Sequence, residues 1–158
     1  MPHPQRASIV LAAALIALAC LALPGTAGAS VGIRGGFSSD PDQFLVGMQV
    51  ETPPVGKDLY IIPSGEAGFG DDAFSLSFNG DLQYRFGSQE NARPYVGGGL
   101  TYFYVDPDNG DSDSGFGLTV LGGVIFERKS GQPIFLEAKI GLDNEIPDFK
   151  MVVGLNFK

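Results

Sequence analysis

The sequence predicts an all-β protein, namely an eight-stranded antiparallel up-and-down transmembrane β-barrel preceded by a signal-peptide helix. Apolar and polar side chains alternate through eight segments, acidic residues are sorted to one end of these segments, and aromatic residues gather near both ends. Successive side chains of a strand point to opposite faces, so the alternation places each strand between an apolar and a polar medium. An even number of hairpin-linked strands can close into a barrel, and closure leaves no open sheet edge.

Residues 1–29 have the pattern of a secretory signal peptide. Arg6 is their only charged side chain, and an apolar run follows at residues 9–23. This run is shorter than the about 20 residues that a membrane-spanning helix needs. An A-x-A motif ending at Ala29 then supplies a cleavage site, so we expect cleavage between Ala29 and Ser30.

Residues 30–158 are expected to form one domain, the outer-membrane barrel itself. Cys20 and His3 are the only cysteine and histidine of the chain, so this domain has neither, and Cys20 leaves a lipoprotein alternative open. Without Arg6, the domain has 9 Lys and Arg residues against 18 Asp and Glu. This acidic balance argues against nucleic acid as a partner, which needs a basic surface. No apolar stretch of helix length remains, which excludes a helical membrane protein.

The clearest alternating segment covers residues 74–86, where Phe, Leu and Tyr alternate with Ser, Asn, Asp, Gln and Arg. Turn-forming Asp, Asn, Gly and Pro residues occupy the connections between the segments. Gly97 to Gly99 leave the facing of one strand open, and Val152 is an apolar exception on a polar face. The other seven predicted strands lie at residues 31–38, 43–51, 58–69, 93–105, 114–127, 133–142 and 148–157.

Alternation alone does not decide which face points into the barrel. A soluble lipocalin-like barrel has an apolar interior, whereas an outer-membrane barrel has a polar one. Four basic and three acidic residues share the polar face, and inside a narrow barrel they would form a network in which each charge offsets another. The members of this predicted interior charge network are Arg34, Glu66, Asp81, Arg85, Glu137, Lys139 and Lys150.

Charge sorting along the barrel axis favours the membrane alternative. The even-numbered connections and the C-terminus mix acids and bases, whereas the odd-numbered connections are free of Lys and Arg. The two ends of a membrane barrel meet different media, which gives a reason for such sorting that a soluble barrel lacks. The odd-numbered connections and their flanks hold Asp40, Asp42, Asp71, Asp72, Asp106, Asp108, Asp111, Asp113, Asp143, Glu145 and Asp148.

Aromatic residues at both ends of the strands predict the two girdles that flank the apolar band of a membrane barrel. Only Phe78 lies in the middle of a strand. Near the mixed-charge end are Tyr60, Tyr84, Phe86, Tyr95, Phe126, Phe135 and Phe157, and near the acidic end Phe37, Phe44, Phe69, Phe74, Tyr102, Phe103, Tyr104, Phe116 and Phe149.

These features, with the segment PYVGGGL at residues 94–100 and a last strand ending near Phe157, resemble the small outer-membrane β-barrel family of the OmpA transmembrane-domain or OmpX type. The resemblance covers residues 30–158. It implies a Gram-negative outer-membrane location with both termini in the periplasm, contact with lipid and lipopolysaccharide, and a monomer. It also implies insertion by the barrel-assembly machinery with Phe157 as the C-terminal assembly signal, although Lys158 follows where family members usually end on the aromatic residue.

The predicted function is non-enzymatic, with a structural or surface-interaction role. Serine acyl hydrolysis needs a histidine base, and the predicted barrel domain has no histidine. Glu66 or Glu137 would be the lone base of a lipid-modifying enzyme, but charge pairing is the better interpretation of both. Eight strands leave an interior that side chains just fill, which disfavours a general porin. A soluble periplasmic lipocalin-like binder is the main alternative, and a lipid-modifying barrel enzyme the third.

The acidic loop between the fifth and sixth predicted strands is the one candidate metal site, and no other cofactor is expected. Carboxylates at alternate positions around Gly110 resemble a calcium loop, but Gly117 stands where an EF-hand has its bidentate Glu. A solvated hairpin tip explains the same residues, and a second hypothesis has the whole acidic end bind divalent cations that bridge to lipopolysaccharide phosphates. The candidate calcium ligands are Asp106, Asp108, Asp111 and Asp113.

Overall fold

The computed structural model describes residues 28–70, 73–87, 91–129 and 131–157. Most of the predicted signal peptide, including Cys20, lies outside these residues, as do Asp71, Asp72 and Lys158. In the described part of the chain, no helix has the length and hydropathy needed to span a bilayer. Its strands are β1 (Ser30–Ser39), β2 (Gln43–Glu51), β3 (Leu59–Phe69), β4 (Ala73–Arg85), β5 (Ala92–Pro107), β6 (Asp113–Phe126), β7 (Ile134–Gly141) and β8 (Phe149–Phe157).

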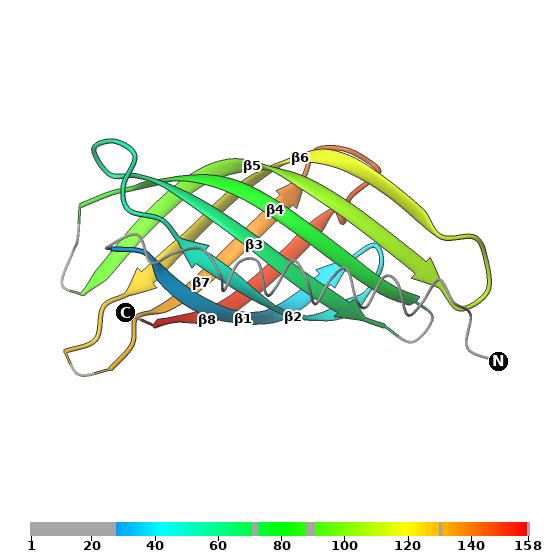
Figure 1. Cartoon of the computed structure of the whole chain (residues 1–158), viewed down its shortest axis with the longest axis horizontal. Coiled ribbons are helices and arrows are strands. Elements are labelled where there is room, and N and C mark those ends of the chain that lie inside the picture. The colour runs from blue at the N-terminus through cyan, green and yellow to red at the C-terminus, as the bar shows by residue number, and fades with distance from the viewer. Residues whose placement is uncertain (1–27, 71–72, 88–90, 130, 158) are drawn as a thin grey trace.

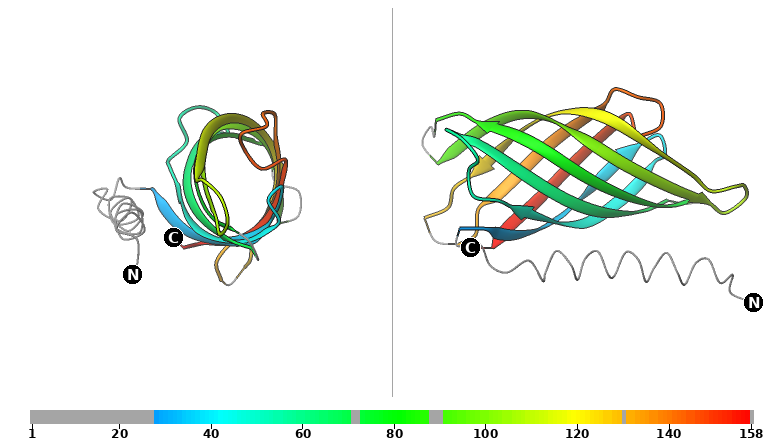
Figure 2. Two further views of the ribbon diagram at one scale, coloured as in Figure 1. Left: turned by 90° about the vertical axis from the view of Figure 1, so that its right-hand side faces the viewer. Right: turned by 45° about the horizontal axis from the view of Figure 1, so that its top comes forward.

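The eight strands form one closed barrel, as the alternation predicts (Figure 1). Each strand pairs antiparallel with the next, and β1 pairs with β8 from Val31 opposite Phe157 to Ser39 opposite Phe149. Seen along its axis, the barrel is a ring of strands (Figure 2, left). Every predicted strand boundary lies within two residues of the observed one, so the eight-stranded antiparallel fold is confirmed.

The alternating pattern places apolar side chains on the outside of the barrel and polar ones inside. Consecutive residues of β7 show this division, because Leu136 is 45% exposed whereas Glu137 is 1% exposed. The same parity resolves the glycine-rich strand β5, where Thr101 is buried inside and Leu100 is exposed outside. A protein folded in water has the opposite distribution of apolar and charged residues, so this exterior is suited to lipid.

The barrel has two different ends. We call the end with the β1–β2, β3–β4, β5–β6 and β7–β8 connections the acidic rim, and the opposite end the mixed rim. The β5–β6 hairpin projects beyond the rest of the acidic rim (Figure 1). This follows from the register, because β6 pairs with β7 only as far as Thr119 but with β5 as far as Asp113.

Part of the lumen is apolar, which the alternation does not predict. Val152, the exception on the polar face of β8, belongs to this interior cluster. The ring of Phe135 lies so close over Gly154 that a Cβ at this position would collide with it. The cluster consists of Tyr95, Leu121, Ile125, Phe135 and Val152.

The prediction of the two aromatic girdles is therefore wrong for four residues, whose side chains face the lumen. Tyr95, Phe103 and Phe135 are at most 6% exposed and point into the barrel, and Tyr60 stacks on the guanidinium of Arg85. These four residues occupy inward-facing positions of their strands, and position along the axis alone does not distinguish them from outward-facing ones. Aromatic side chains of the exterior pack in the pairs Phe37–Phe44, Phe69–Phe74, Tyr102–Phe116 and Tyr84–Phe86.

Candidate functional site

The centre of the lumen is organised by Arg34, which β1 directs inward. Its Nε lies 2.9 Å from Oε1 of Glu66, and its Nη2 donates a hydrogen bond of 2.9 Å to Oε1 of Glu137. Its Nη1 donates to Oε1 of Gln49 at 3.1 Å. One guanidinium thus offsets two carboxylates that come from β3 and β7, and all four side chains are buried. Charge-assisted bonds of this kind are the stronger hydrogen bonds in proteins.

Two lysines continue the network toward the acidic rim. Lys150 donates to Oε2 of Glu66 at 2.7 Å and to the hydroxyl of Ser77 at 3.0 Å. Lys139 donates to Oδ2 of Asp81 at 2.6 Å. Each buried ammonium therefore has a carboxylate partner, which compensates the large cost of removing a charge from water.

Glu137 is held from two sides. Its Oε2 accepts hydrogen bonds from the hydroxyl of Tyr95 at 3.0 Å and from Nε2 of Gln83 at 3.1 Å, while Oε1 accepts from Arg34. Tyr95 also belongs to the apolar cluster of the lumen. The phenol therefore joins the charged and apolar parts of the interior.

Replacing Tyr95 with Phe is expected to lower the free energy of unfolding by about 1.5–3 kcal/mol, because it removes a buried hydrogen bond to a charged group. Urea unfolding of the barrel in detergent, followed by gel mobility, measures the difference. Tyr84→Phe is the matched control, since Tyr84 is 44% exposed on the exterior. Equal stability of the two variants would contradict the role given to the Tyr95 hydroxyl.

Near the mixed rim, Arg85 pairs with Glu51 at 2.8 Å and lies over the ring of Tyr60, with 3.9 Å between its Cζ and the ring centroid. Asn156 donates to the same carboxylate at 3.2 Å. Glu51, the last residue of β2, is not in the predicted network, and the structure adds it there as the partner of Arg85. With Glu51, the four basic side chains of the network face four carboxylates.

The structure places all seven side chains of the predicted interior charge network in the lumen, where they are at most 5% exposed. Ion pairs or charged hydrogen bonds join every member to another of this set or to Glu51. The predicted network contains charged residues only and leaves out their neutral polar partners. Gln49, Ser77 and Gln83 share the inward parity of their strands, which is the signal that would have identified them.

The predicted calcium ligands do not converge. Among the residues that the structure describes, no group of three or more His, Cys, Asp and Glu side chains is placed to hold a metal ion. Pairing of β5 with β6 ends at Val105 opposite Asp113, so Asp106, Asp108 and Asp111 lie beyond the last pair of these two strands. The Asp113 carboxylate instead accepts a hydrogen bond from the amide of Ser114 at 2.8 Å. The calcium site stays a sequence prediction that this geometry does not assemble.

The residues expected to mark the ends of the barrel domain lie beside each other. Ser30, the residue after the predicted cleavage site, begins β1 and is 7% exposed. Phe157, the predicted assembly signal, ends β8, pairs with Val31 and is 43% exposed. Both therefore lie at the β1–β8 junction that closes the barrel.

A closed barrel with an apolar outside and an ion-paired inside has the architecture of a transmembrane β-barrel. No protein-family model matches the sequence, and no curated protein matches it either. Among solved structures, the N-terminal β-barrel domain of Pseudomonas aeruginosa OprF is similar, with a TM-score of 0.67, 16% identity, and coverage of 82% of this chain and 96% of that chain.

Two further structures share the architecture. Neisserial surface protein A is similar with a TM-score of 0.63, 17% identity, and coverage of 82% of this chain and 94% of that chain. The outer membrane enzyme PagL is similar with a TM-score of 0.52, 13% identity, and coverage of 82% of this chain and 99% of that chain. At these identities the likeness shows the fold alone, and the fold includes an enzyme among its members.

Proposed function

We propose that this protein is an outer-membrane β-barrel with a structural or surface-interaction role and without a catalytic site. The observation that carries the proposal is the division within single strands, in which an exposed Leu136 stands next to a buried, ion-paired Glu137. The apolar exterior is suited to contact with lipid. The charged side chains of the lumen offset one another. The similar structure of PagL, which is named as an outer membrane enzyme, supports an outer-membrane location.

Both candidate bases, Glu66 and Glu137, are engaged in ion pairs or hydrogen bonds within the lumen, which supports a non-enzymatic role. Glu66 contacts both Arg34 and Lys150, and Glu137 accepts from Arg34, Tyr95 and Gln83. A carboxylate that serves as a general base needs free access to the proton that it removes. Here the carboxylate oxygens are engaged within a filled lumen.

Fractionation combined with gel mobility tests the location. We expect the protein in the outer-membrane fraction, soluble only in detergent, and migrating differently before and after heating because the closed barrel resists unfolding by the gel detergent. Recovery from the periplasm without detergent would instead support the soluble lipocalin-like alternative.

We further propose that the acidic rim faces the cell exterior and carries the surface-interaction role. The β5–β6 hairpin is the part of this rim that reaches furthest (Figure 2, right), and its Ser112 is exposed. An epitope inserted after Ser112 is expected to be detected by antibody on intact cells, whereas one inserted after Arg128, at the mixed rim, is expected to be detected only after lysis. The reverse pattern would invert the proposed orientation.

A further inference from the structure

The β7–β8 connection, residues 142–148, does not extend away from the barrel as the β5–β6 hairpin does. Ile146 is 4% exposed and Pro147 is also buried, although both lie in a loop. Their neighbours in the same loop, Asn144 and Glu145, are exposed. The loop therefore turns its two apolar residues inward, over the mouth of the lumen.

The barrel wall is shaped to receive this loop. A Cβ on Gly117 of β6 would lie 2.7–2.9 Å from three side-chain atoms of Ile146, so an alanine here would displace that side chain. The amide of Gly141 donates to the carbonyl of Asp148 at 2.9 Å and closes the base of the loop, and two further hydrogen bonds tie the loop to β6. The amide of Leu118 donates to the carboxylate of Asp143 at 2.7 Å, and the amide of Leu142 donates to the carbonyl of Leu118 at 2.9 Å.

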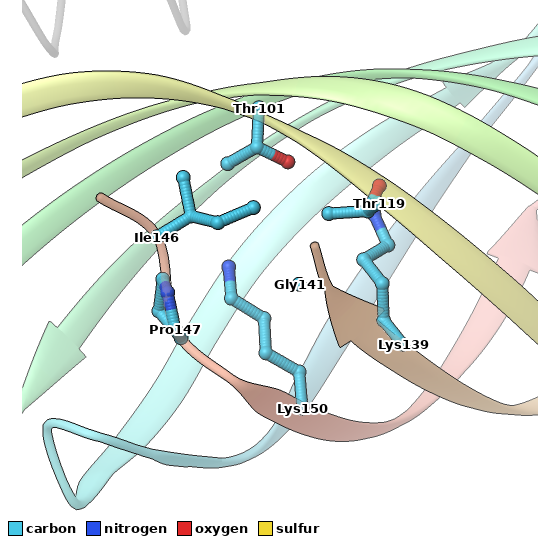
Figure 3. Close-up of a pocket in the computed structure, with 7 residues that line it drawn as sticks. All are labelled: Thr101, Thr119, Lys139, Gly141, Ile146, Pro147 and Lys150. Atoms are coloured by element: carbon cyan, nitrogen blue, oxygen red, sulfur yellow. The ribbon is translucent and has the colours of Figure 1, made fainter. Parts of the chain in front are cut away.

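Ile146 and Pro147 are part of the lining of a pocket (Figure 3). It is nowhere wide enough for a water molecule. The side chains of Lys139 and Lys150 rise into it toward Thr119 and Ile146. The pocket is lined by Thr101, Thr119, Lys139, Gly141, Ile146, Pro147 and Lys150.

We propose that the β7–β8 loop is a cap that closes the lumen at the acidic rim. The side chain of Ile146 blocks the opening. The ammonium groups of Lys139 and Lys150 meet solvent from this side only when the loop leaves its place. The apolar cluster around Phe135 is built on paired strands, so moving it requires breaking barrel hydrogen bonds. The cap lies outside the paired strands and is held by a few hydrogen bonds, so it opens more easily than the strands that carry the apolar cluster.

Thiol labelling tests the cap, because Cys20 is the only cysteine of the chain. In a Cys20→Ser background, Thr119→Cys places one thiol in the pocket, and Ser112→Cys places one on the exposed hairpin. The barrels are reconstituted in lipid vesicles and treated with a charged, membrane-impermeant maleimide. Reaction of the buried thiol depends on its access to water. We expect Thr119→Cys to react at least ~10-fold more slowly than Ser112→Cys.

Adding Ile146→Gly to Thr119→Cys is expected to raise the labelling rate at least ~10-fold, because the side chain that blocks the opening is removed. Leu142→Gly is the matched control in the same loop, since Leu142 is 58% exposed and points away from the lumen, and it should leave the rate unchanged. Gly117→Ala is the second opening variant, because it expels Ile146 without removing it, and gel mobility before heating shows which variants are folded.

Three results would overturn the proposal. The first is labelling of Thr119→Cys as fast as Ser112→Cys in the otherwise unchanged barrel, which would mean that the mouth is open. The second is slow labelling that persists in folded Ile146→Gly and Gly117→Ala variants, which would mean that Ile146 does not close it. The third is equal acceleration by Leu142→Gly, which would mean general loosening of the loop. The test does not depend on which way the barrel faces in the cell.

Discussion

Replacing Arg34 with Met is expected to destabilise the folded barrel by about 3–5 kcal/mol, the usual effect of removing one partner of a buried ion pair. The guanidinium contacts Glu66 and Glu137, which are both buried, so its loss leaves each carboxylate without one of its partners. Urea unfolding in detergent, followed by the gel mobility of the unheated protein, measures the change in the free energy of unfolding.

Arg128→Met is the matched control for this variant. Arg128 is an exposed residue of the β6–β7 connection, and replacing a charge at such a position changes stability little. A double variant in which Arg34→Met is combined with Glu137→Gln is expected to recover part of the loss, because Glu137 no longer carries the charge that Arg34 offsets, whereas Glu66 still pairs with Lys150. A loss below ~1 kcal/mol for Arg34→Met, as for an exposed pair, would contradict the network as a source of stability.

Replacing Gly36 with Ala is expected to cost about 3 kcal/mol or more, at the upper end of the range for overpacking. Gly36 lies opposite Val152 where β1 meets β8, the junction that closes the barrel. A Cβ at this position would collide with the carbonyl group of Met151, which is backbone and cannot turn aside as a side chain can. The strands must separate or shift, so we also expect slower folding into detergent micelles or vesicles.

Gly80→Ala provides the comparison. Gly80 lies on β4, and a Cβ there meets nothing within 4 Å. A glycine in a strand costs conformational entropy, so Ala at this free position is expected to be neutral or slightly stabilising. If Gly36→Ala and Gly80→Ala unfold at the same urea concentration, the close contact between β1 and β8 does not limit barrel closure.

The strands and their facing could be predicted because they follow a local rule. Side chains alternate between two faces, so Phe74 and Ser75 report their own environments without knowledge of the rest of the chain. The division holds at Leu136 and Glu137 for the same reason. Once the polar face is assigned to the lumen, the interior position of the charged residues follows from parity alone.

The partners within the lumen could not be predicted in this way. Whether Arg34 meets Glu66, Glu137 or Asp81 depends on how far the strands shift relative to one another around the ring, and alternation does not contain that shift. The inward turn of Ile146 also escapes a rule that treats connections as solvated turns. Likewise, Tyr95 and Phe135 were placed in the girdles because an aromatic residue near a strand end fits either face.

The chain has no tryptophan, so single Trp probes test the central claim, lipid outside and charge inside, without background. Leu136→Trp and Phe135→Trp place the indole at neighbouring positions of β7 that are 45% and 2% exposed. In vesicles of brominated phospholipid, which quenches indoles at close range, we expect Leu136→Trp to lose several-fold more fluorescence than Phe135→Trp. Stronger quenching of Phe135→Trp, or no quenching of either variant in a folded barrel, would contradict the account.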